Sequence, residues 1–252
     1  MKYLTKNLTL AAAITLAMAT LGAGLARAED AKPEAKPDNE ISFNAALTSD
    51  YRYRGISQTR LKPALQGGAD YTHNPSGFYA GTWLSTIKWI KDAGGDGSVE
   101  WDLYGGKRGE IAKDVSYDVG GLYYYYPSNS LATSANTFEI YGAIGYGPAS
   151  LKYSHSTTNL FGFTDSKNSG YVDASYNQDV YDGYTLNLHV GHQKVKHTSS
   201  ASYTDWKIGV TKDYGVVTLA LAVIRADTDA YFAPNGKDLA KTGAVLTVSK
   251  TF

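Results

Sequence analysis

The feature that most constrains this sequence is an alternation of apolar and polar residues, which begins at Ile41 and recurs in short segments up to the C-terminus. The first segment has two chemically distinct faces. One face carries Ile41, Phe43, Ala45, Leu47 and Tyr51, and the other carries Ser42, Asn44, Thr48, Asp50, Arg52 and Arg54. A period of two residues is typical of a β-strand with one face in an apolar environment. The sequence therefore predicts an all-β fold.

Twelve segments of this kind follow one another, separated by turn residues. We predict strands at residues 41–53, 64–73, 77–87, 98–108, 114–126, 137–147, 149–157, 169–178, 183–193, 203–212, 216–226 and 242–252. Short turns alternate with longer polar loops at residues 55–63, 88–97, 127–136, 158–168 and 227–241. Outer-membrane barrels have this asymmetry, because their periplasmic turns are short and their extracellular loops are long. The predicted fold is a transmembrane, antiparallel, up-and-down β-barrel of about twelve strands, with both termini on the short-turn side.

The N-terminal segment has the three parts of a secretory signal peptide. Lys2 and Lys6 precede an apolar run over residues 8–25, and residues 26–28 form a small-residue cleavage site. We therefore expect residues 1–28 to be removed. Residues 29–40 contain two prolines, many charges and no large apolar side chain, which predicts a disordered periplasmic linker. The barrel would then occupy residues 41–252, in the outer membrane of a Gram-negative bacterium.

Composition excludes several classes of function. The chain after residue 28 carries a small excess of acidic over basic residues, so we expect no nucleic-acid partner. The absence of cysteine means that no disulfide stabilises the fold. The five histidines do not have the spacing of metal ligands, and no glycine-rich phosphate loop occurs. No cofactor and no metal are expected.

A soluble secreted barrel is the main alternative fold, since the same apolar face could point inward. The loop asymmetry, the aromatic residues near strand ends and the terminal Phe252 favour the membrane instead. These aromatic residues are Tyr51, Tyr53, Tyr123, Tyr125, Tyr126, Tyr146, Tyr153, Tyr184 and Phe252. Phe252 would also serve as the insertion signal, so the expected partners are outer-membrane lipids and the barrel-insertion machinery.

Four motifs resemble one known family. They are SDYRYRGISQT at residues 49–59, PALQGGADY at 63–71, SGFYAGTW at 76–83 and DLYGG at 102–106. Together they are similar to the TorF-family porins, also called Gcw_chp proteins, over nearly all of the chain after the signal. The resemblance implies an outer-membrane barrel of a proteobacterium. It implies neither a catalytic residue nor a particular solute.

The predicted lumen is narrow. Twelve strands about 4.8 Å apart and tilted by about 40° enclose a backbone cylinder roughly 24 Å wide, which leaves a bore of at most about 10 Å for ions and small solutes. The side chains predicted to face it are Asp50, Asp70, Glu100, Asp102, Asp118, Glu139, Asp173, Asp205, Arg52, Arg54, Lys152, Lys207, Tyr104 and Tyr124. Carboxylates outnumber cations, which predicts a weak cation preference. The sequence leaves open that these charges instead pair across strands and brace a largely plugged barrel.

The run Asp50, Arg52 and Arg54 lies where the first strand approaches the first long loop. Such a mixed-charge run could form a constriction or a docking point. It is more often a solvated ionic face.

Residues 123–126 are four successive tyrosines, two on each face of one strand. Tyr123 and Tyr125 are expected to form a girdle at the level of the lipid headgroups. Tyr124 and Tyr126 could stack on flat solutes inside the barrel, or simply fill a narrow lumen. Their expected neighbours in the lumen are Tyr104, Tyr141 and Trp83.

Three functions remain as hypotheses. The favoured one is a porin or channel for passive diffusion of ions and small solutes. The alternative is a non-conducting barrel that acts as a receptor, an adhesin or a structural protein through its long loops. A remote alternative is a lipid hydrolase, because His155, Thr157 and Asn159 share one strand face, although no oxyanion hole is evident. No catalytic residue is expected, and the solute and the oligomeric state stay open.

Overall fold

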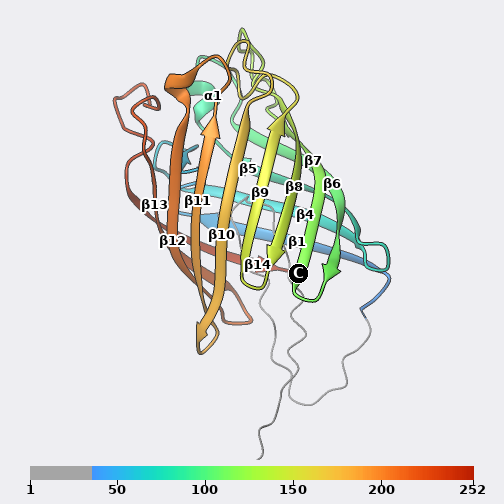
Figure 1. Cartoon of the computed structure of the whole chain (residues 1–252). Coiled ribbons are helices and arrows are strands. Elements are labelled where there is room, and N and C mark those ends of the chain that lie inside the picture. The colour runs from blue at the N-terminus through green and yellow to red at the C-terminus, as the bar shows by residue number, and fades with distance from the viewer. Residues whose placement is uncertain (1–35) are drawn as a thin grey trace, which may run out of the picture.

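The computed structural model describes residues 36–252, so the expected signal peptide and residues 29–35 of the expected linker lie outside the described residues. Twelve strands close into one antiparallel barrel (Figure 1). They are β1 (Asn39–Thr48), β4 (Ala64–His73), β5 (Phe78–Thr86), β6 (Val99–Ala112), β7 (Val115–Tyr125), β8 (Thr137–Tyr146), β9 (Ala149–Ser156), β10 (Gly170–Tyr181), β11 (Tyr184–Lys194), β12 (Tyr203–Asp213), β13 (Thr218–Ala226) and β14 (Gly243–Thr251). The loops carry β2 (Arg52–Tyr53), β3 (Ile56–Ser57), a helical turn α1 (Trp89–Asp92) and a 3-10 turn η1 (Ser199–Ala201).

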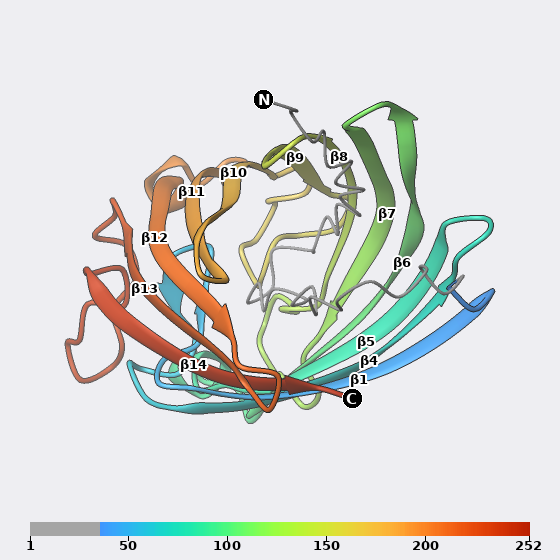
Figure 2. The same ribbon diagram turned by 90° about the horizontal axis from the view of Figure 1, so that it is seen from below.

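The barrel closes where the first and last strands pair. β1 and β14 run antiparallel, with Leu47 opposite Val248, and Phe43 and Phe252 exchange backbone hydrogen bonds of 2.8 and 3.1 Å. Figure 2 shows the resulting ring of strands, seen from the end at which the chain terminates. Closure leaves the sheet without an unpaired edge, as a bilayer requires.

The predicted asymmetry of the connections is present. The turns after β4, β6, β8, β10 and β12 are short and lie at one end of the barrel, together with the C-terminus, whereas the longer loops lie at the other end (Figure 1). The predicted fold class of a twelve-stranded antiparallel barrel is therefore confirmed. Most strand ends agree with the prediction to within a few residues.

The first strand is the main exception. β1 begins at Asn39, so Asn39 and Glu40 belong to the barrel and not to the linker. It ends at Thr48, although the alternating pattern predicted a strand up to residue 53. The chain turns there because the Asp50 carboxylate accepts hydrogen bonds from Ser57 and Thr59, which folds the segment back on itself.

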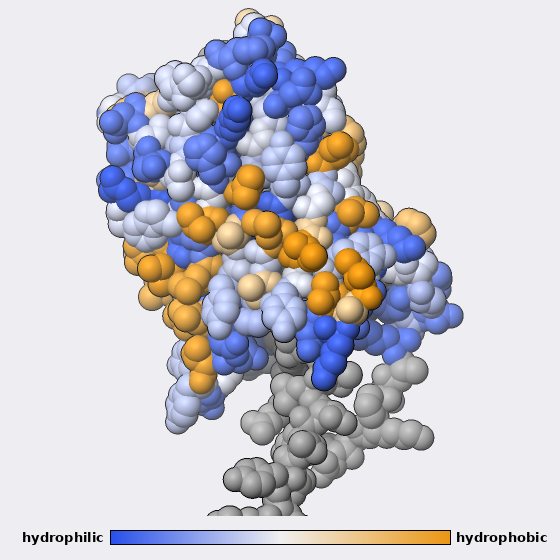
Figure 3. Space-filling view, in the orientation of Figure 1, coloured by the Kyte–Doolittle hydropathy of each residue, from blue (hydrophilic) through white to orange (hydrophobic). Residues whose placement is uncertain are grey.

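The two faces of the barrel wall differ in polarity, as the alternation predicts. Large apolar side chains are exposed on the outside, including Ile41, Phe43, Leu47, Leu65, Leu84, Leu103, Ile140, Ile144, Leu151, Val172, Val190, Ile208, Leu221 and Leu246. On the face that Figure 3 shows, hydrophobic side chains gather across the middle, below hydrophilic loops. Charged side chains such as Asp102 and Asp205 are buried inside. A soluble barrel needs the opposite arrangement, so this is a transmembrane barrel.

No helix within residues 36–252 is long and apolar enough to cross a membrane.

Several interior tyrosines lie flat across glycines of neighbouring strands. A Cβ atom at Gly191 would overlap the ring of Tyr171, and one at Gly81 would overlap the ring of Tyr104. Each of these glycines leaves room for a large ring to rest against the wall instead of projecting across the lumen.

Candidate functional site in the barrel lumen

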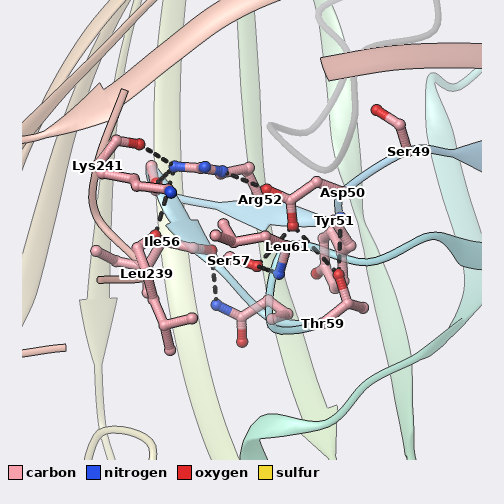
Figure 4. A network of polar contacts seen from close by, with 12 residues as sticks. Ser49, Asp50, Tyr51, Arg52, Ile56, Ser57, Thr59, Leu61, Leu239 and Lys241 are labelled. Atoms are coloured by element: carbon pink, nitrogen blue, oxygen red, sulfur yellow. Dashed lines mark hydrogen bonds and ion pairs between the residues drawn. The ribbon is translucent and has the colours of Figure 1, made fainter. Parts of the chain in front are cut away.

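The loop at residues 49–63, which joins β1 to β4, folds into the barrel. Its buried Asp50 carboxylate accepts hydrogen bonds from Ser57 Oγ at 2.6 Å and Thr59 Oγ1 at 3.2 Å, and from Arg52 Nε at 2.7 Å (Figure 4). The small β2–β3 hairpin is part of the same fold. The alternating pattern suggested that Asp50, Arg52 and Arg54 lie on a spanning strand. In the structure they lie on an inward-folded loop.

Arg52 fastens this loop to a second loop, the one that precedes β14. Its Nη1 donates to the carbonyl oxygens of Lys241 at 2.8 Å, Leu239 at 3.4 Å and Gly55 at 3.1 Å (Figure 4). Gly55 itself, with a φ of 80°, passes so close to the wall that a Cβ would lie 2.6 Å from Cβ of Asp205. A residue with a side chain would not fit here.

Arg54 lies at the tip of the loop and contacts three strands. Nη2 lies 2.7 Å from Glu139 Oε2 on β8, and Nη1 donates to Gln193 Oε1 on β11 at 2.6 Å. The guanidinium is also 4.2 Å from the ring centroid of Tyr171 on β10. Burial lowers the pKa of Arg54, but Glu139, Tyr53 and Tyr124 together raise it well above its usual value.

The two tyrosines of the loop also point into the barrel. Tyr51 Oη donates to Glu100 Oε1 at 2.5 Å, and Tyr126 Oη donates to Glu100 Oε2 at 2.8 Å. Tyr53 Oη lies 2.6 Å from Tyr124 Oη. Tyr51 and Tyr53, which the sequence suggested as membrane-interface aromatic residues near a strand end, lie inside the barrel instead, whereas Tyr126 faces the lumen as predicted. The first two leave the strand pattern with the loop, and Tyr126 continues the inward face of β7.

The loop between β9 and β10 completes this cluster of aromatic rings. Phe161, between β9 and β10, packs with ring centroids 5.6 Å from Tyr53, 5.1 Å from Tyr124 and 6.4 Å from Tyr126. Tyr51, Tyr124 and Tyr126 are almost fully buried. Of the two interpretations of these tyrosines, the structure favours the filling of a narrow barrel over an exposed track for solutes. The cluster occupies the part of the lumen next to β5–β8.

Tyrosine hydroxyls bind most of the interior carboxylates. Besides the pairs with Glu100, Tyr124 donates to Glu139 at 3.2 Å, Tyr104 to Asp70 at 2.6 Å, Tyr79 to Asp118 at 2.6 Å and Tyr171 to Asp205 at 2.7 Å. Asp102 differs from them, because it is fully buried and neither of its oxygens has a hydrogen-bond partner among the described residues. Charged acceptors make the stronger kind of hydrogen bond, so these pairs brace the inner wall.

His189 on β11 joins two further carboxylates and was not singled out from the sequence. Its Nδ1 lies 3.0 Å from Asp173 Oδ2, and its Nε2 lies 2.8 Å from Asp205 Oδ2. Carboxylates within 3.0 Å of both ring nitrogens favour the protonated imidazolium form of His189. The signal in the sequence was that Asp173, His189 and Asp205 all occupy inward-facing positions of their strands, β10, β11 and β12. Within residues 36–252, no group of three or more His, Cys, Asp or Glu side chains has an arrangement that could hold a metal ion.

The rest of the lumen contains a cavity of about 150 Å³ that is partly open to solvent. The charged residues that line it are Asp50, Arg52, Arg54, Lys152, Asp173, His189, Asp205 and Lys207. Tyr124 also lines it, whereas Asp70, Glu100, Asp102, Tyr104, Asp118 and Glu139 do not. The residues predicted to face the lumen thus divide into a cavity-lining group and a group packed with the tyrosines.

The candidate hydrolase residues are not brought together. His155 contacts Tyr153 Oη at 3.3 Å and Asn168 Oδ1 at 3.2 Å, whereas Thr157 Oγ1 donates to the Phe138 carbonyl at 3.3 Å. A nucleophile and its base would have to lie within hydrogen-bond reach of each other.

Comparison with known proteins bears on the family and the fold. A family model described as "Bacterial protein of unknown function (Gcw_chp)" matches residues 32–252. No curated protein matches the sequence. A solved structure named "KdgM porin" matches with a TM-score of 0.54 and 7% identity, over 84% of this chain and 97% of that chain. Another, described as "Unveiling the Mechanism Behind the in-meso Crystallization of Membrane Proteins", matches with a TM-score of 0.51 and 8% identity, over 84% of this chain and 83% of that chain. At this identity the likeness shows a porin-like fold alone.

Proposed function

This chain belongs to the Gcw_chp family, and we propose that it is an outer-membrane channel for the passive diffusion of ions and small solutes. The observation that carries the proposal is a solvent-connected cavity, lined by polar and charged side chains, inside a barrel that is apolar outside and polar inside. A closed barrel with a polar interior is the architecture of aqueous channels in outer membranes. The porin activity implied by the resemblance to TorF-family proteins is part of the same proposal.

The inward-folded loop at residues 49–63 is the constriction of this channel. It lines the cavity through residues 50–55, and the aromatic cluster occupies the space on its other side. A solute would therefore pass beside the loop, along the residues of β9–β14 that line the cavity. Three contacts of Arg54 fix the width of that passage.

The proposed location is the outer membrane. A signal peptide at residues 1–28 would export the chain, and lipids of the outer membrane would surround its apolar face. Phe252, which is 71% exposed at the end of β14, would be read by the barrel-insertion machinery.

Liposome swelling tests the proposal. Vesicles that contain the refolded chain should swell in sugars and amino acids up to a sharp size limit, and more slowly as the solute grows. The refolded barrel should also migrate faster on a gel before heating than after it. A barrel that shows this heat-modifiable migration but causes no swelling in any solute would contradict the channel function.

A second function is favoured by a specific observation, namely that two loops and a cluster of rings fill part of the lumen. A barrel plugged in this way could be a non-conducting receptor, adhesin or structural protein. Under this alternative, swelling would be absent both in the native chain and in a variant with Arg54 replaced by Ala. Under the channel function, the variant should swell faster than the native chain.

A further inference from the structure

We infer that the cavity beside the inward-folded loop favours small anions, such as chloride and small carboxylates, over cations. The inference rests on the proposed channel function. It has the opposite sign to the weak cation preference that a count of the inner-face charges predicts. The difference arises because the carboxylates and the lysines are placed differently with respect to the cavity.

Most interior carboxylates are set apart from the cavity or saturated by donors of the barrel. Asp70, Glu100, Asp102, Asp118 and Glu139 do not line it. Of the three that do, Asp50 binds Arg52, Ser57 and Thr59. Asp205 binds Tyr171 and His189. Asp173 accepts a hydrogen bond from Ser175 through Oδ1, and its Oδ2 lies 3.0 Å from Nδ1 of His189 without accepting a hydrogen bond among the described residues. A carboxylate whose lone pairs are taken by such donors is a poor ligand for a passing cation.

The acidic and the basic residues that line the cavity also differ in how far they are exposed. Asp50, Asp173 and Asp205 are 6%, 4% and 1% exposed, whereas Lys152 and Lys207 are only partly buried. The two lysine residues therefore present more of their surface than the three aspartates do.

Lys152 on β9 is the main contact that we assign to an anion. Its Nζ lies 4.0 Å from the ring centroid of Tyr141, which holds the ammonium by its π face. Among the described residues Nζ makes no hydrogen bond and no ion pair. An ammonium has three N–H donors, so donors of Lys152 stay available to a solute that carries an oxyanion or a halide.

The fixed charges of the lining leave an excess of one positive charge. Arg52 is neutralised by Asp50, and Arg54 by Glu139. The imidazolium of His189 leaves one net negative charge on its pair of aspartates, and Lys152 and Lys207 together carry two positive charges. In a narrow lumen the sign of the lining selects the ion.

The reversal potential of the refolded chain in a planar bilayer tests this inference. Across a KCl gradient we expect a potential displaced toward the chloride equilibrium potential. Lys152→Gln and Lys207→Gln should each move it toward the potassium equilibrium potential, and the double variant should move it furthest. Lys113→Gln is the matched control, because Lys113 is exposed in the short turn between β6 and β7, away from the cavity, and it should leave the potential unchanged.

The outcomes separate this inference from the channel function on which it rests. Conductance with a potential displaced toward potassium would overturn the anion preference and leave the channel function standing. The same holds for a potential that neither lysine substitution moves while heat-modifiable migration shows a folded barrel. Absence of conductance in the folded native chain would overturn both.

Discussion

The guanidinium of Arg54 lies 2.7 Å from the carboxylate of Glu139, and this ion pair connects the first long loop to the wall of the barrel at β8. Both side chains are buried, at 6% and 2% exposure. The pair decides where the inward-folded loop rests, and with it the width of the passage beside the loop.

Replacing Arg54 by Ala should therefore loosen the loop and destabilise the barrel. The change leaves Glu139 without its buried counter-charge, which we expect to lower the free energy of unfolding by about 3 kcal/mol. Conductance should rise, since the constriction is no longer held. Denaturant unfolding of the refolded barrel and bilayer conductance measure the two effects.

Arg60→Ala is the matched control for this prediction. Arg60 is on the same loop and pairs with Asp92, but its side chain is 38% exposed. Exposed ion pairs contribute little to stability. Equal effects of the two substitutions would show that Arg54 has no special part in holding the loop.

Tyr171→Phe tests the bond between a tyrosine and an interior carboxylate. The change removes the 2.7 Å hydrogen bond to Asp205 and keeps the ring on which Arg54 rests. We expect a loss of about 1 to 2 kcal/mol in the free energy of unfolding. Tyr153→Phe is the control, because its hydroxyl reaches His155 only at 3.3 Å on the exposed outer face. If both variants unfold alike, the interior pairs do not brace the wall.

Gly191→Ala tests the packing of rings over glycines. The new methyl group would overlap the ring of Tyr171 and push it toward the cavity. Overpacking of this kind costs about 1 to 3 kcal/mol, and we expect the displaced ring to reduce conductance as well. At Gly142 the nearest atom to a new Cβ is 4.0 Å away, so Gly142→Ala should unfold like the native chain. A Gly191→Ala variant with native stability and conductance would refute the packing role.

The features of this fold that depend on neighbouring residues can be predicted from the sequence, whereas those that depend on contacts between distant residues cannot. The twelve strands, their inward and outward faces and the alternation of turns and loops are local patterns, and a period of two residues reveals them. The inward-folded loop is different. In the segment DYRYR the alternation continues past Thr48, so Tyr51 and Tyr53 read as strand residues. Only their distant partners Glu100 and Tyr124 show that they lie inside the barrel.

The chemistry of the lumen could be predicted only in part. Parity identified the charged residues of the inner face, but not which ones contact each other. The pairing of Tyr104 with Asp70, or of His189 with Asp173 and Asp205, depends on the register of neighbouring strands. A count of charges therefore gave the carboxylates the same weight as the lysines, although tyrosines, hydroxyls and a histidine bind most of the carboxylates.

The C-terminal residue gives a prediction about assembly. Phe252 is 71% exposed, while its backbone pairs with Phe43 in both directions. Phe252→Ala keeps this pairing and removes the ring, so we expect the barrel to remain foldable in detergent but to reach the outer membrane in smaller amounts. Phe232→Ala, at a ring 52% exposed in the loop before β14, is the control. The heat-modifiable fraction in outer-membrane preparations measures the effect, and equal amounts of both variants would contradict an insertion signal at Phe252.

The single-channel conductance of the refolded native chain in a planar bilayer tests the central claim most directly. A channel narrowed by the inward-folded loop should give discrete current steps of uniform small size, and Arg54→Ala should enlarge these steps. If a barrel with heat-modifiable migration gives no current steps, with or without that substitution, the chain is not a channel.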